Sequence, residues 1–485
     1  MGAEIRKTKA TDRIMRLIAE KADESQISEV VEKYQQQERA KVGEPVLLDW
    51  NFNNKRLDKA THEVSKLLYL GRDTEKGMRF LNCLLANMVA NIHTGLPSPT
   101  AVSTKHALYG NRFSVEMQRN ILDGMVSAGL IHKQKHSQEN GMAASYKPML
   151  RLNKIINDNY DDRSRFHWQK SKVNELTINR RDVEDKNSPD DVAVMSARKY
   201  PEATKLRSEL KEINENIQSQ PFELLVRTAL PKEITSVARD GYIVRDNILA
   251  YAHEPELYKE GDGFSYKATP NTTLKRAFNL YKGEVLGGRH FGTGSGHYLG
   301  LKRQKRKEDV LWNGHRMVEI DANGAHMAIE YALNGLKAPT NPYIYDKGDS
   351  FKRDVMKKLG LVTLNKIGTN YKDATKGGLI GDILDGNLDL NALFWFEHRY
   401  KQLKSEFIKH NEEIAHVFGM GRVYKLMSVE SEIMNRTMLA LNQMDIPYLP
   451  VFDAMKTLEN EAKTVSEVLE STSKAVLGTP LTYSV

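Results

Sequence analysis

The stretch VEIDANGAHMAIEYALNG, residues 318–335, joins a strand pattern directly to a helix pattern. Apolar and polar residues alternate over 318–320, as in a strand, and apolar residues at helical spacing follow from Gly324 onward. Asp321 is therefore expected at the end of a strand. A carboxylate in such a position is ordinarily a turn residue or a helix cap, so this stretch alone favours a structural role.

The composition is that of a soluble protein with several domains. The chain has 485 residues, 40% of them hydrophobic and 28% charged, and this length predicts about two to four compact units. No stretch approaches the roughly 18 consecutive apolar residues of a membrane span, and the N-terminus lacks the apolar segment of a secretory signal. Its only cysteine, Cys83, excludes an internal disulfide and a cysteine zinc site. We therefore expect a cytoplasmic protein without a membrane partner.

Positive charge is concentrated on either side of the opening stretch. The formal net charge of the chain is +8. Residues 275–316 contain ten Lys and Arg against three Asp and Glu, and residues 351–376 contain seven against two. This distribution favours an anionic partner, such as nucleic acid or nucleotides, more strongly than the net charge does.

The N-terminal third predicts a small helical unit with a basic hairpin. We expect charged helices over 1–58, then helices over 74–93 and 114–128, followed by two strands around a turn at Asn140 and Gly141. This order is typical of a winged helix-turn-helix domain over 59–154. Its predicted DNA contacts come from the second helix and from the wing: Arg112, Gln118, Arg119, Lys133, Lys135 and Lys147. The alternative is a small domain whose hairpin contacts protein.

Residues 155–222 are polar and charged, with one expected helix over 202–218, and we interpret them as a linker or spacer. The segment contains no internal repeat, and neither does the rest of the chain, which excludes solenoid architectures.

A second aspartate has the same kind of setting as Asp321. The apolar run over 446–452 breaks at Asp453 and then resumes, which predicts a hairpin with this aspartate at its tip. Just before it we expect a helix over 428–444 with Glu430 and Glu432 in its first turn. Two carboxylates at the edge of one sheet can hold a pair of Mg²⁺ ions about 4 Å apart, with Mn²⁺ as a possible substitute.

A basic helix lies between the two aspartates in sequence. Arg353 and Lys357 are four residues apart and therefore project from one face of the expected helix, where they could bind successive phosphates. Without the aspartates, a solvated basic helix would be the better interpretation. Together, these parts match the requirements of nucleotidyl transfer: metal ions for the reacting groups and cations for a triphosphate.

At these residues the chain resembles the right-hand polymerases of the superfamily that includes bacterial DNA polymerase I and the phage single-subunit RNA polymerases. Asp321 with the following ANGAH is similar to motif A of that family, Arg353 and Lys357 to motif B, and Asp453 in VFDA to motif C. The stretch LGGRHFGTGSGH resembles the segment before the palm, which implies that Arg289 contacts template or primer. The resemblance covers roughly 270–460 and implies a palm with an antiparallel sheet and mostly helical fingers and thumb.

Several positions depart from the family pattern. Phe452 replaces the motif C histidine, Leu361 replaces an aromatic residue, and Asn365 stands where the family has a tyrosine near the nucleotide. His326 occupies the position of a glutamate that excludes the ribose 2′ hydroxyl in the DNA enzymes. An imidazole there could also exclude that hydroxyl, which favours deoxynucleotides, or it could anchor the helix by packing.

The sequence therefore predicts a multidomain α+β protein with a winged helix and a polymerase core over 223–485. We expect a template-directed nucleotidyltransferase, a DNA polymerase of a phage or mobile element, with or without priming activity. Further expected nucleic-acid contacts lie in the first basic segment: Lys302, Arg303 and Arg306. The alternatives are a single-subunit RNA polymerase or primase, template-independent nucleotide addition, and a non-catalytic DNA-binding replication initiator or regulator.

Overall fold

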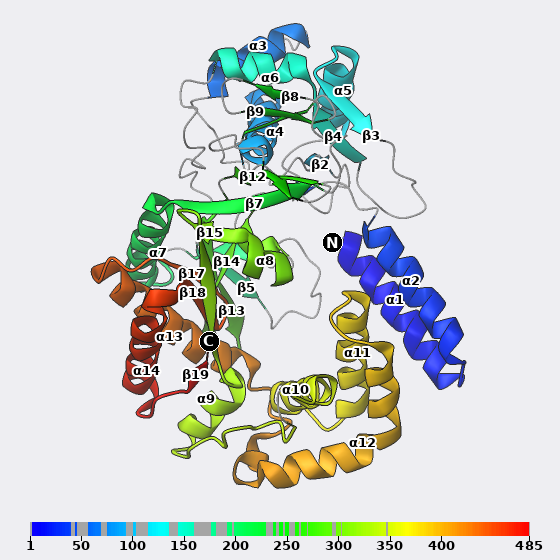
Figure 1. Cartoon of the computed structure of the whole chain (residues 1–485), viewed down its shortest axis with the longest axis vertical. Coiled ribbons are helices and arrows are strands. Elements are labelled where there is room, and N and C mark those ends of the chain that lie inside the picture. Colours follow the sequence, from blue (N-terminus) through cyan, green and yellow to red (C-terminus); the bar gives the residue numbers. More distant parts are fainter. Residues whose placement is uncertain are drawn as a thin grey trace.

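The structure is a computed structural model of the whole chain (Figure 1). It describes most of the chain, in the following ranges: 2–39, 44–45, 57–68, 75–93, 100–102, 115–134, 144–159, 176–180, 192–195, 198–228, 236–238, 242–245, 248–251, 258–260, 263–268, 270–292, 297–301, 303–345 and 348–484.

An eight-stranded sheet in which all pairings are antiparallel forms the centre of the C-terminal half. Its strand order is β11-β12-β7-β15-β16-β18-β17, and β19 also pairs with β16. The strands are β7 (Phe222–Thr228), β11 (Tyr258–Glu260), β12 (Gly263–Ala268), β15 (Val310–Trp312), β16 (His315–Ala322), β17 (Tyr448–Val451), β18 (Ala454–Leu458) and β19 (Tyr483–Ser484). The two strand patterns of the sequence, β16 and the β17–β18 hairpin, are therefore neighbours in one sheet.

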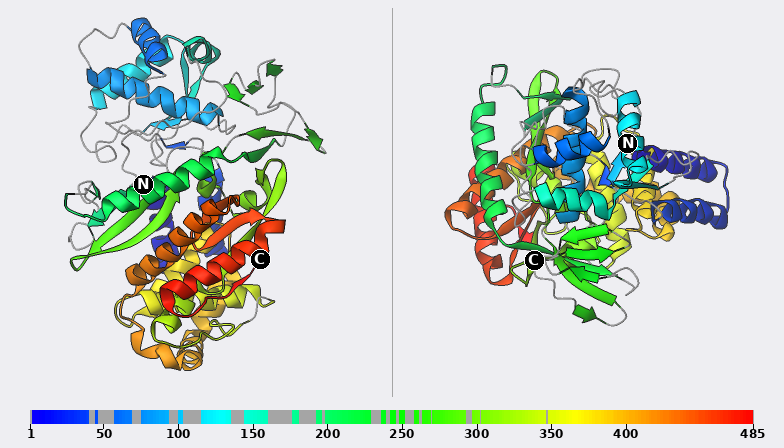
Figure 2. Two further views of the ribbon diagram at one scale, coloured as in Figure 1. Left: turned by 90° about the vertical axis from the view of Figure 1, so that its left-hand side faces the viewer. Right: turned by 90° about the horizontal axis from the view of Figure 1, so that it is seen from above.

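Helices from both ends of this half cover the sheet. The apolar side chains of β16 and β18, including Ile320 and Met455, are buried in one core with the strands and helices around them. The helices of this core are α7 (Ala203–Ser219), α13 (Val423–Gln443) and α14 (Ala462–Leu477). Figures 1 and 2 show α13 and α14 side by side against the sheet.

A second, four-stranded sheet packs into the same core and changes the interpretation of the predicted linker. Its order is β14-β13-β5-β6, with strands β5 (Leu176–Arg180), β6 (Val192–Val194), β13 (Leu274–Tyr281) and β14 (Glu284–Gly292). Leu176, Ile178 and Leu210 are buried in the core. The prediction that 155–222 is a spacer is therefore wrong for β5 and α7, because their apolar side chains help to form the main core. Strand β6 pairs with β5 in the same sheet. The helix expected over 202–218 is confirmed as α7.

A second core joins the remaining C-terminal helices to the N-terminus. It contains side chains from α9 (Ala325–Leu333), α10 (Ser350–Asn365), α11 (Tyr371–Leu384), α12 (Leu390–His410), α1 (Gly2–Ala19) and α2 (Glu24–Arg39). Lys7 forms an ion pair with Asp385 at 2.5 Å, and the Gln35 side chain donates to the carbonyl of Ile383 at 3.1 Å. Figure 1 shows α1 and α2 lying along α11. The N-terminal helices are thus part of the C-terminal half.

The residues between these regions form a separate small core. Its elements are α3 (Asp58–Leu67), α4 (Glu75–His93), α5 (Val115–Ser127), α6 (Leu150–Asn159), β3 (Ile131–Gln134) and β4 (Ala144–Pro148). Its sheet has the order β1-β2-β4-β3, where β1 is Glu44–Pro45 and β2 is Thr100–Val102. The predicted helices and antiparallel hairpin are confirmed, and Gly129 ends α5 with a left-handed backbone, φ 65°. The hairpin turn at 140–141 lies outside the described residues.

Two details of the sequence prediction need correction. Gln118 is 1% exposed, so it belongs to the core and not to a DNA-facing surface. Helix α13 begins at Val423, five residues before the expected start, and its first turn contains no acid. Ser428 does not cap the helix, since its hydroxyl donates to the carbonyl of Tyr424 at 3.0 Å inside it. Glu430 is therefore a mid-helix residue.

The described part of the chain is an α+β structure, as predicted, and includes a further three-stranded sheet of β8 (Ser236–Ala238), β9 (Tyr242–Arg245) and β10 (Ile248–Tyr251). None of the helices described has both the length and the apolar character that crossing a membrane requires.

Candidate active site

The two predicted aspartates lie on neighbouring strands. Asp321 is the penultimate residue of β16 and pairs with Ala454, the first residue of β18. Asp453 comes immediately before Ala454, in the two-residue turn that joins β17 to β18. The two carboxylates, 132 residues apart in sequence, are therefore brought together where β16 ends and β18 begins, at the same end of two neighbouring strands of the central sheet. This confirms the predicted strand end at Asp321 and the predicted hairpin tip at Asp453.

The backbone after Asp321 requires a glycine to turn from strand into helix. Gly324 has a left-handed backbone, φ 65°, and a Cβ atom at this position would lie 2.9 Å from the Pro342 side chain. Helix α9 begins at the next residue, so the site is enclosed between the end of β16 and the start of α9.

The electrostatic environment opposes two negative charges at this edge. Burial, together with the negative charges of Glu430 and Asp321, raises the pKa of Asp453 to about 6. Burial also raises the pKa of Asp321, against the opposing positive charges of Lys357 and Arg303. Two half-buried carboxyl groups that repel each other fit a divalent cation, which would neutralise both. Among the described residues, no cluster of three or more His, Cys, Asp and Glu side chains is arranged to hold a metal, so a metal here would depend on this pair.

Helix α10 carries the predicted cations to the same place. Lys357 is exposed, and its positive charge acts on both Asp321 and Asp453. Arg353 lies one turn earlier with its guanidinium 5.6 Å from the ring centre of Tyr343. Tyr343 is fully buried beneath the site, and burial together with the two aspartates raises its pKa above the ordinary value. Lys357 thus lies near the carboxyl pair, and Arg353 lies one helical turn away against Tyr343.

A chain of four polar side chains from four elements connects the second sheet with α10. Arg289 of β14 donates to Glu430 of α13 through Nε at 2.9 Å and through Nη2 at 2.7 Å. The other carboxylate contact is His326 of α9, whose Nε2 lies 3.1 Å from Glu430, and Asn365 of α10 lies 3.4 Å from the His326 Nδ1. Burial alone would raise the pKa of Glu430, but the His326 hydrogen bond and the Arg289 charge hold it below its ordinary value. We name these four residues the buried relay.

The sequence predicts that Arg289 contacts template or primer, and in the structure its guanidinium is bound to Glu430 within the buried relay. Two of its nitrogen atoms are occupied by Glu430, so it is fixed in place before any ligand binds. Glu430 was not identified as a site residue from the sequence, since its partner Arg289 is 141 residues away and only the fold brings them together.

Phe452 occupies a strained and exposed position next to Asp453. Its backbone is left-handed, φ 57°, which is uncommon for a bulky residue. The ring is 37% exposed, makes an edge contact with Phe291 at 6.3 Å between ring centres, and has the Arg289 guanidinium 5.7 Å away. Phe452 thus gives the site an exposed aromatic face.

The other predicted nucleic-acid contacts differ in their environments. Arg303 is exposed on α8 (Arg303–Asp309), and Lys302 lies outside the described residues. Arg306 is buried, and its Nη1 donates to the carbonyl of Leu301 at 3.4 Å. The prediction that Arg306 contacts nucleic acid is therefore wrong, because its guanidinium faces the interior.

The predicted contacts of the small N-terminal unit are only partly described. Arg119 is exposed on α5. Lys133 of β3 lies 3.6 Å from Asp123 of α5 and 6.0 Å from the ring centre of Tyr146. Arg112 and Lys135 lie outside the described residues, as does the side chain of Lys147. Of the predicted contacts, the structure thus describes one exposed arginine and one lysine beside an acid.

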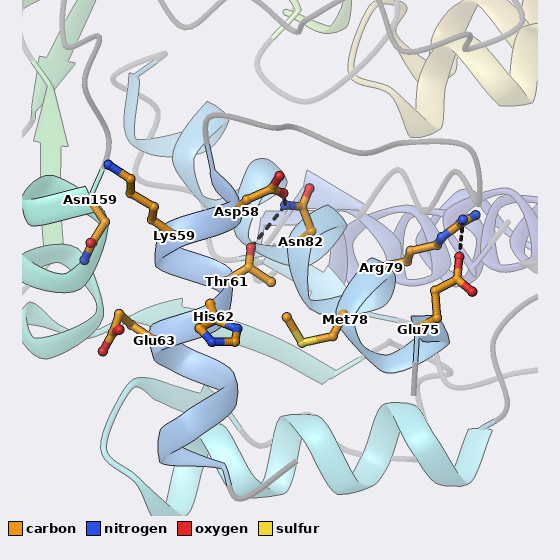
Figure 3. Close-up of a pocket in the computed structure, with 10 residues that line it drawn as sticks. All are labelled: Asp58, Lys59, Thr61, His62, Glu63, Glu75, Met78, Arg79, Asn82 and Asn159. Carbon is orange, nitrogen blue, oxygen red and sulfur yellow. Dashed lines mark hydrogen bonds and ion pairs between the residues drawn. The ribbon is translucent and has the colours of Figure 1, made fainter. Parts of the chain in front are cut away.

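The same unit contains a hollow of about 680 Å³ between α3 and α4, shown in Figure 3. Its polar groups bind one another: the Asn82 side chain donates to Asp58 at 3.3 Å and to Thr61 at 3.1 Å, and Arg79 pairs with Glu75. Acids and bases are mixed along its walls, so the hollow offers no ligand a single charge to recognise.

Comparison with known proteins adds no family to this description. No protein-family model matches the chain, and no curated protein is significantly similar to it in sequence.

Proposed function

We propose that the chain is a template-directed nucleotidyltransferase that extends DNA, with a right-hand polymerase core in 223–485. The observation that carries this proposal is the meeting of Asp321 and Asp453 at one sheet edge beside Lys357. The antiparallel central sheet and the helices α10–α12 support the same assignment, since they fit a palm and fingers.

Each residue of the site has a role in this proposal. Asp321 and Asp453 would hold Mg²⁺, or Mn²⁺ in its place, and the metal would activate the primer hydroxyl and stabilise the leaving pyrophosphate. Lys357 and Arg353, on one face of α10, bind the negatively charged phosphates of the incoming nucleotide. The buried relay fixes α9, α10 and α13 relative to one another, so that these groups keep their positions when nucleotide binds.

The small N-terminal unit is proposed to be a winged helix that binds duplex DNA. Helix α5 is followed directly by the β3–β4 hairpin. Strand β4 lies between β3 and β2 and pairs with both. This order supports α5 as the recognition helix and the hairpin as the wing. The association of polymerase and winged helix suits replication of a phage or mobile element.

Primer extension tests the proposal. The purified chain is incubated with Mg²⁺, a primed DNA template and either deoxynucleotides or ribonucleotides, together with Asp321→Asn, Asp453→Asn and Asp445→Asn variants. We expect the wild type and Asp445→Asn to incorporate deoxynucleotides, because Asp445 is exposed and has no role in the proposed site. The Asp321→Asn and Asp453→Asn variants should show only background incorporation. If both Asp321→Asn and Asp453→Asn still extend the primer, the two aspartates are not the metal ligands of the reaction.

One observation favours a second candidate, a non-catalytic DNA-binding initiator. The carboxyl pair has no third acidic or histidine ligand among the described residues, and Phe452 takes the place of a polar residue beside Asp453. Such a protein would bind duplex DNA with strong salt dependence and incorporate nothing in the same assay. Incorporation of ribonucleotides without a primer would instead identify a transcribing or priming enzyme.

A further inference from the structure

A groove of about 1180 Å³ is lined by four segments of the chain, and two of its lining residues, Arg303 and Lys357, are the cations whose charges act on Asp321. Arg303 and Lys307 come from α8, Lys357 and Lys358 come from α10, and the turn after α11 and the N-terminal helix α2 supply the remaining walls. Figure 1 shows α2 alongside α11, and Tyr34 and Gln35 of α2 line this cavity of the C-terminal half. We name this cavity the cationic groove.

The acidic residues of the cationic groove are mostly neutralised within the protein. Asp382 is paired with Lys358 at 2.7 Å, and Asp385 is paired with Lys7 at 2.5 Å. Within the part of the chain that the structure describes, no ion pair joins Arg303, Lys307 or Lys357 to an acid. Among the described lining residues, these three cations therefore remain for a ligand, and Asp354 is the one acid that no ion pair neutralises.

A buried lysine fixes the two cations of α8 relative to the carboxyl pair. Lys456 is fully buried on β18, three residues after Asp453, and its Nζ donates to the backbone carbonyls of Arg306 at 2.5 Å and Lys307 at 3.4 Å. Strand β18, the second strand of the hairpin that carries Asp453, thus holds α8. Arg303 and Lys307 are one helical turn apart and project from the same face.

The lining favours a polyphosphate over a nucleic acid strand. Single strands bind on exposed aromatic side chains that stack with bases, but among the described residues of the lining the only aromatic one is Tyr34, which is 6% exposed. Closely spaced lysine and arginine side chains without a stacking surface suit a compact chain of phosphates.

We propose that the cationic groove binds polyphosphate: it receives the triphosphate of the incoming nucleotide and releases pyrophosphate, with Arg303 and Lys307 as binding residues on the side of the central sheet. This inference rests on the proposed nucleotidyl transfer for its reaction, and it assigns Arg303 to the nucleotide and not to the template. It also gives α2 a function, as one wall of the cationic groove.

Direct binding tests the groove independently of synthesis. Inorganic tripolyphosphate is titrated calorimetrically into the full chain and into an Arg303→Gln/Lys307→Gln double variant at fixed ionic strength. The matched control is Lys305→Gln, an exposed lysine of the same helix that does not line the groove. We expect the double variant to bind roughly tenfold more weakly or worse, and the control to bind as the wild type does. In primer extension, the double variant should raise KM for nucleotide with a smaller change in kcat, and pyrophosphate should inhibit it less.

The outcomes separate this inference from the proposed function. If tripolyphosphate binding depends on Arg303 and Lys307 but no primer is extended, the polyphosphate site stands and the polymerase assignment falls. If extension requires Asp321 and Asp453 while the double variant binds tripolyphosphate normally, the groove assignment is overturned. It is also overturned if the double variant loses affinity for a single-stranded oligonucleotide and keeps its affinity for tripolyphosphate.

Discussion

Asp321 faces Ala454 across the paired strands β16 and β18, which sets it beside Asp453 at the tip of the adjoining hairpin. Burial and the charges of Glu430 and Asp321 raise the pKa of Asp453 to about 6. An acid held in this way destabilises the metal-free fold at neutral pH, and either a proton or a cation relieves the repulsion.

We expect Asp453→Asn to stabilise the metal-free protein at pH 7, by on the order of 2 kcal/mol. Because its pKa is higher in the folded protein than the ordinary 3.8, the carboxyl has no cost below about pH 4, and its full cost is reached above about pH 6. The advantage of the variant should therefore disappear at pH 4. Denaturant unfolding at the two pH values measures this difference.

Mg²⁺ should stabilise the wild type at pH 7 and leave Asp453→Asn nearly unaffected, since binding to the folded state raises apparent stability. Asp445→Asn is the control, because Asp445 is exposed and asparagine tolerates its left-handed backbone, φ 55°. Equal stabilisation of Asp453→Asn and the wild type by Mg²⁺ would contradict a metal at this position.

Arg289→Gln should cost much more stability than the loss of a comparable surface ion pair. Glu430 is 4% exposed, and the substitution leaves its buried negative charge without its bidentate partner, a loss worth roughly 3–5 kcal/mol. Arg436→Gln is the matched control, because Arg436 pairs with Glu432 at 2.7 Å on the exposed face of the same helix. That pair should contribute only about 0.5 kcal/mol.

Acid should abolish this difference. The pKa of Glu430 lies below 4.5 in the folded protein, so the stability it contributes is present above that pH and is lost as the pH falls through the folded value. Urea unfolding of the two variants at pH 7 and at pH 3 measures the effect. Equal losses in the two variants at pH 7 would show that the buried relay does not hold the site together.

Local sequence patterns were sufficient for the two strand ends and for the helix that carries Arg353 and Lys357, because strand alternation and helical spacing act within a few residues. They failed for Glu430 and for β5. The partner of Glu430 is distant in sequence, and the five residues of β5 are too few to stand out within a charged segment. The burial of Arg306 could not be predicted either, because three of its immediate neighbours are basic and only the packing of α8 decides which of them face solvent.

His326→Ala should lower stability without changing the choice of sugar. The imidazole is held between Glu430 at 3.1 Å and Asn365 at 3.4 Å, so we infer that it anchors α9 to its neighbours. Removing it leaves a buried carboxylate short of a donor, at a cost of roughly 1–3 kcal/mol. Thermal unfolding and the ratio of deoxynucleotide to ribonucleotide incorporation test this. A changed ratio at unchanged stability would return His326 to the role of excluding a 2′ hydroxyl.

Phe452→Asn should leave the fold at least as stable and weaken primer binding. Asparagine accepts the left-handed backbone that strains a phenylalanine, a relief of about 1 kcal/mol, while the ring it removes is partly exposed. In the proposed polymerase the exposed ring beside Asp453 contacts the primer terminus, so the dissociation constant of primed template should rise. Unfolding and fluorescence anisotropy measure the two effects. A marked loss of stability would mean that contact with Phe291 outweighs the backbone strain.

Two substitutions on α5 should change duplex DNA binding in opposite directions. Arg119 is exposed one helical turn before Asp123, and the Asp123 carboxylate lies 3.6 Å from Lys133 on the following strand. Arg119→Gln removes one phosphate contact and should reduce the slope of log affinity against log salt by about 1. Asp123→Asn removes the acid that neutralises Lys133, so it should strengthen binding about threefold at low salt and steepen the slope.

The control for both is Lys154→Gln, an exposed lysine on α6 that is not predicted to contact DNA. If duplex binding uses α5 and the wing, Lys154→Gln leaves the salt slope unchanged, because each contributing cation releases counterions only where it meets a phosphate. A slope that responds equally to Arg119→Gln and Lys154→Gln would instead mean that the whole unit attracts DNA without a docking face. The basic groups of the C-terminal half would then have to select the template.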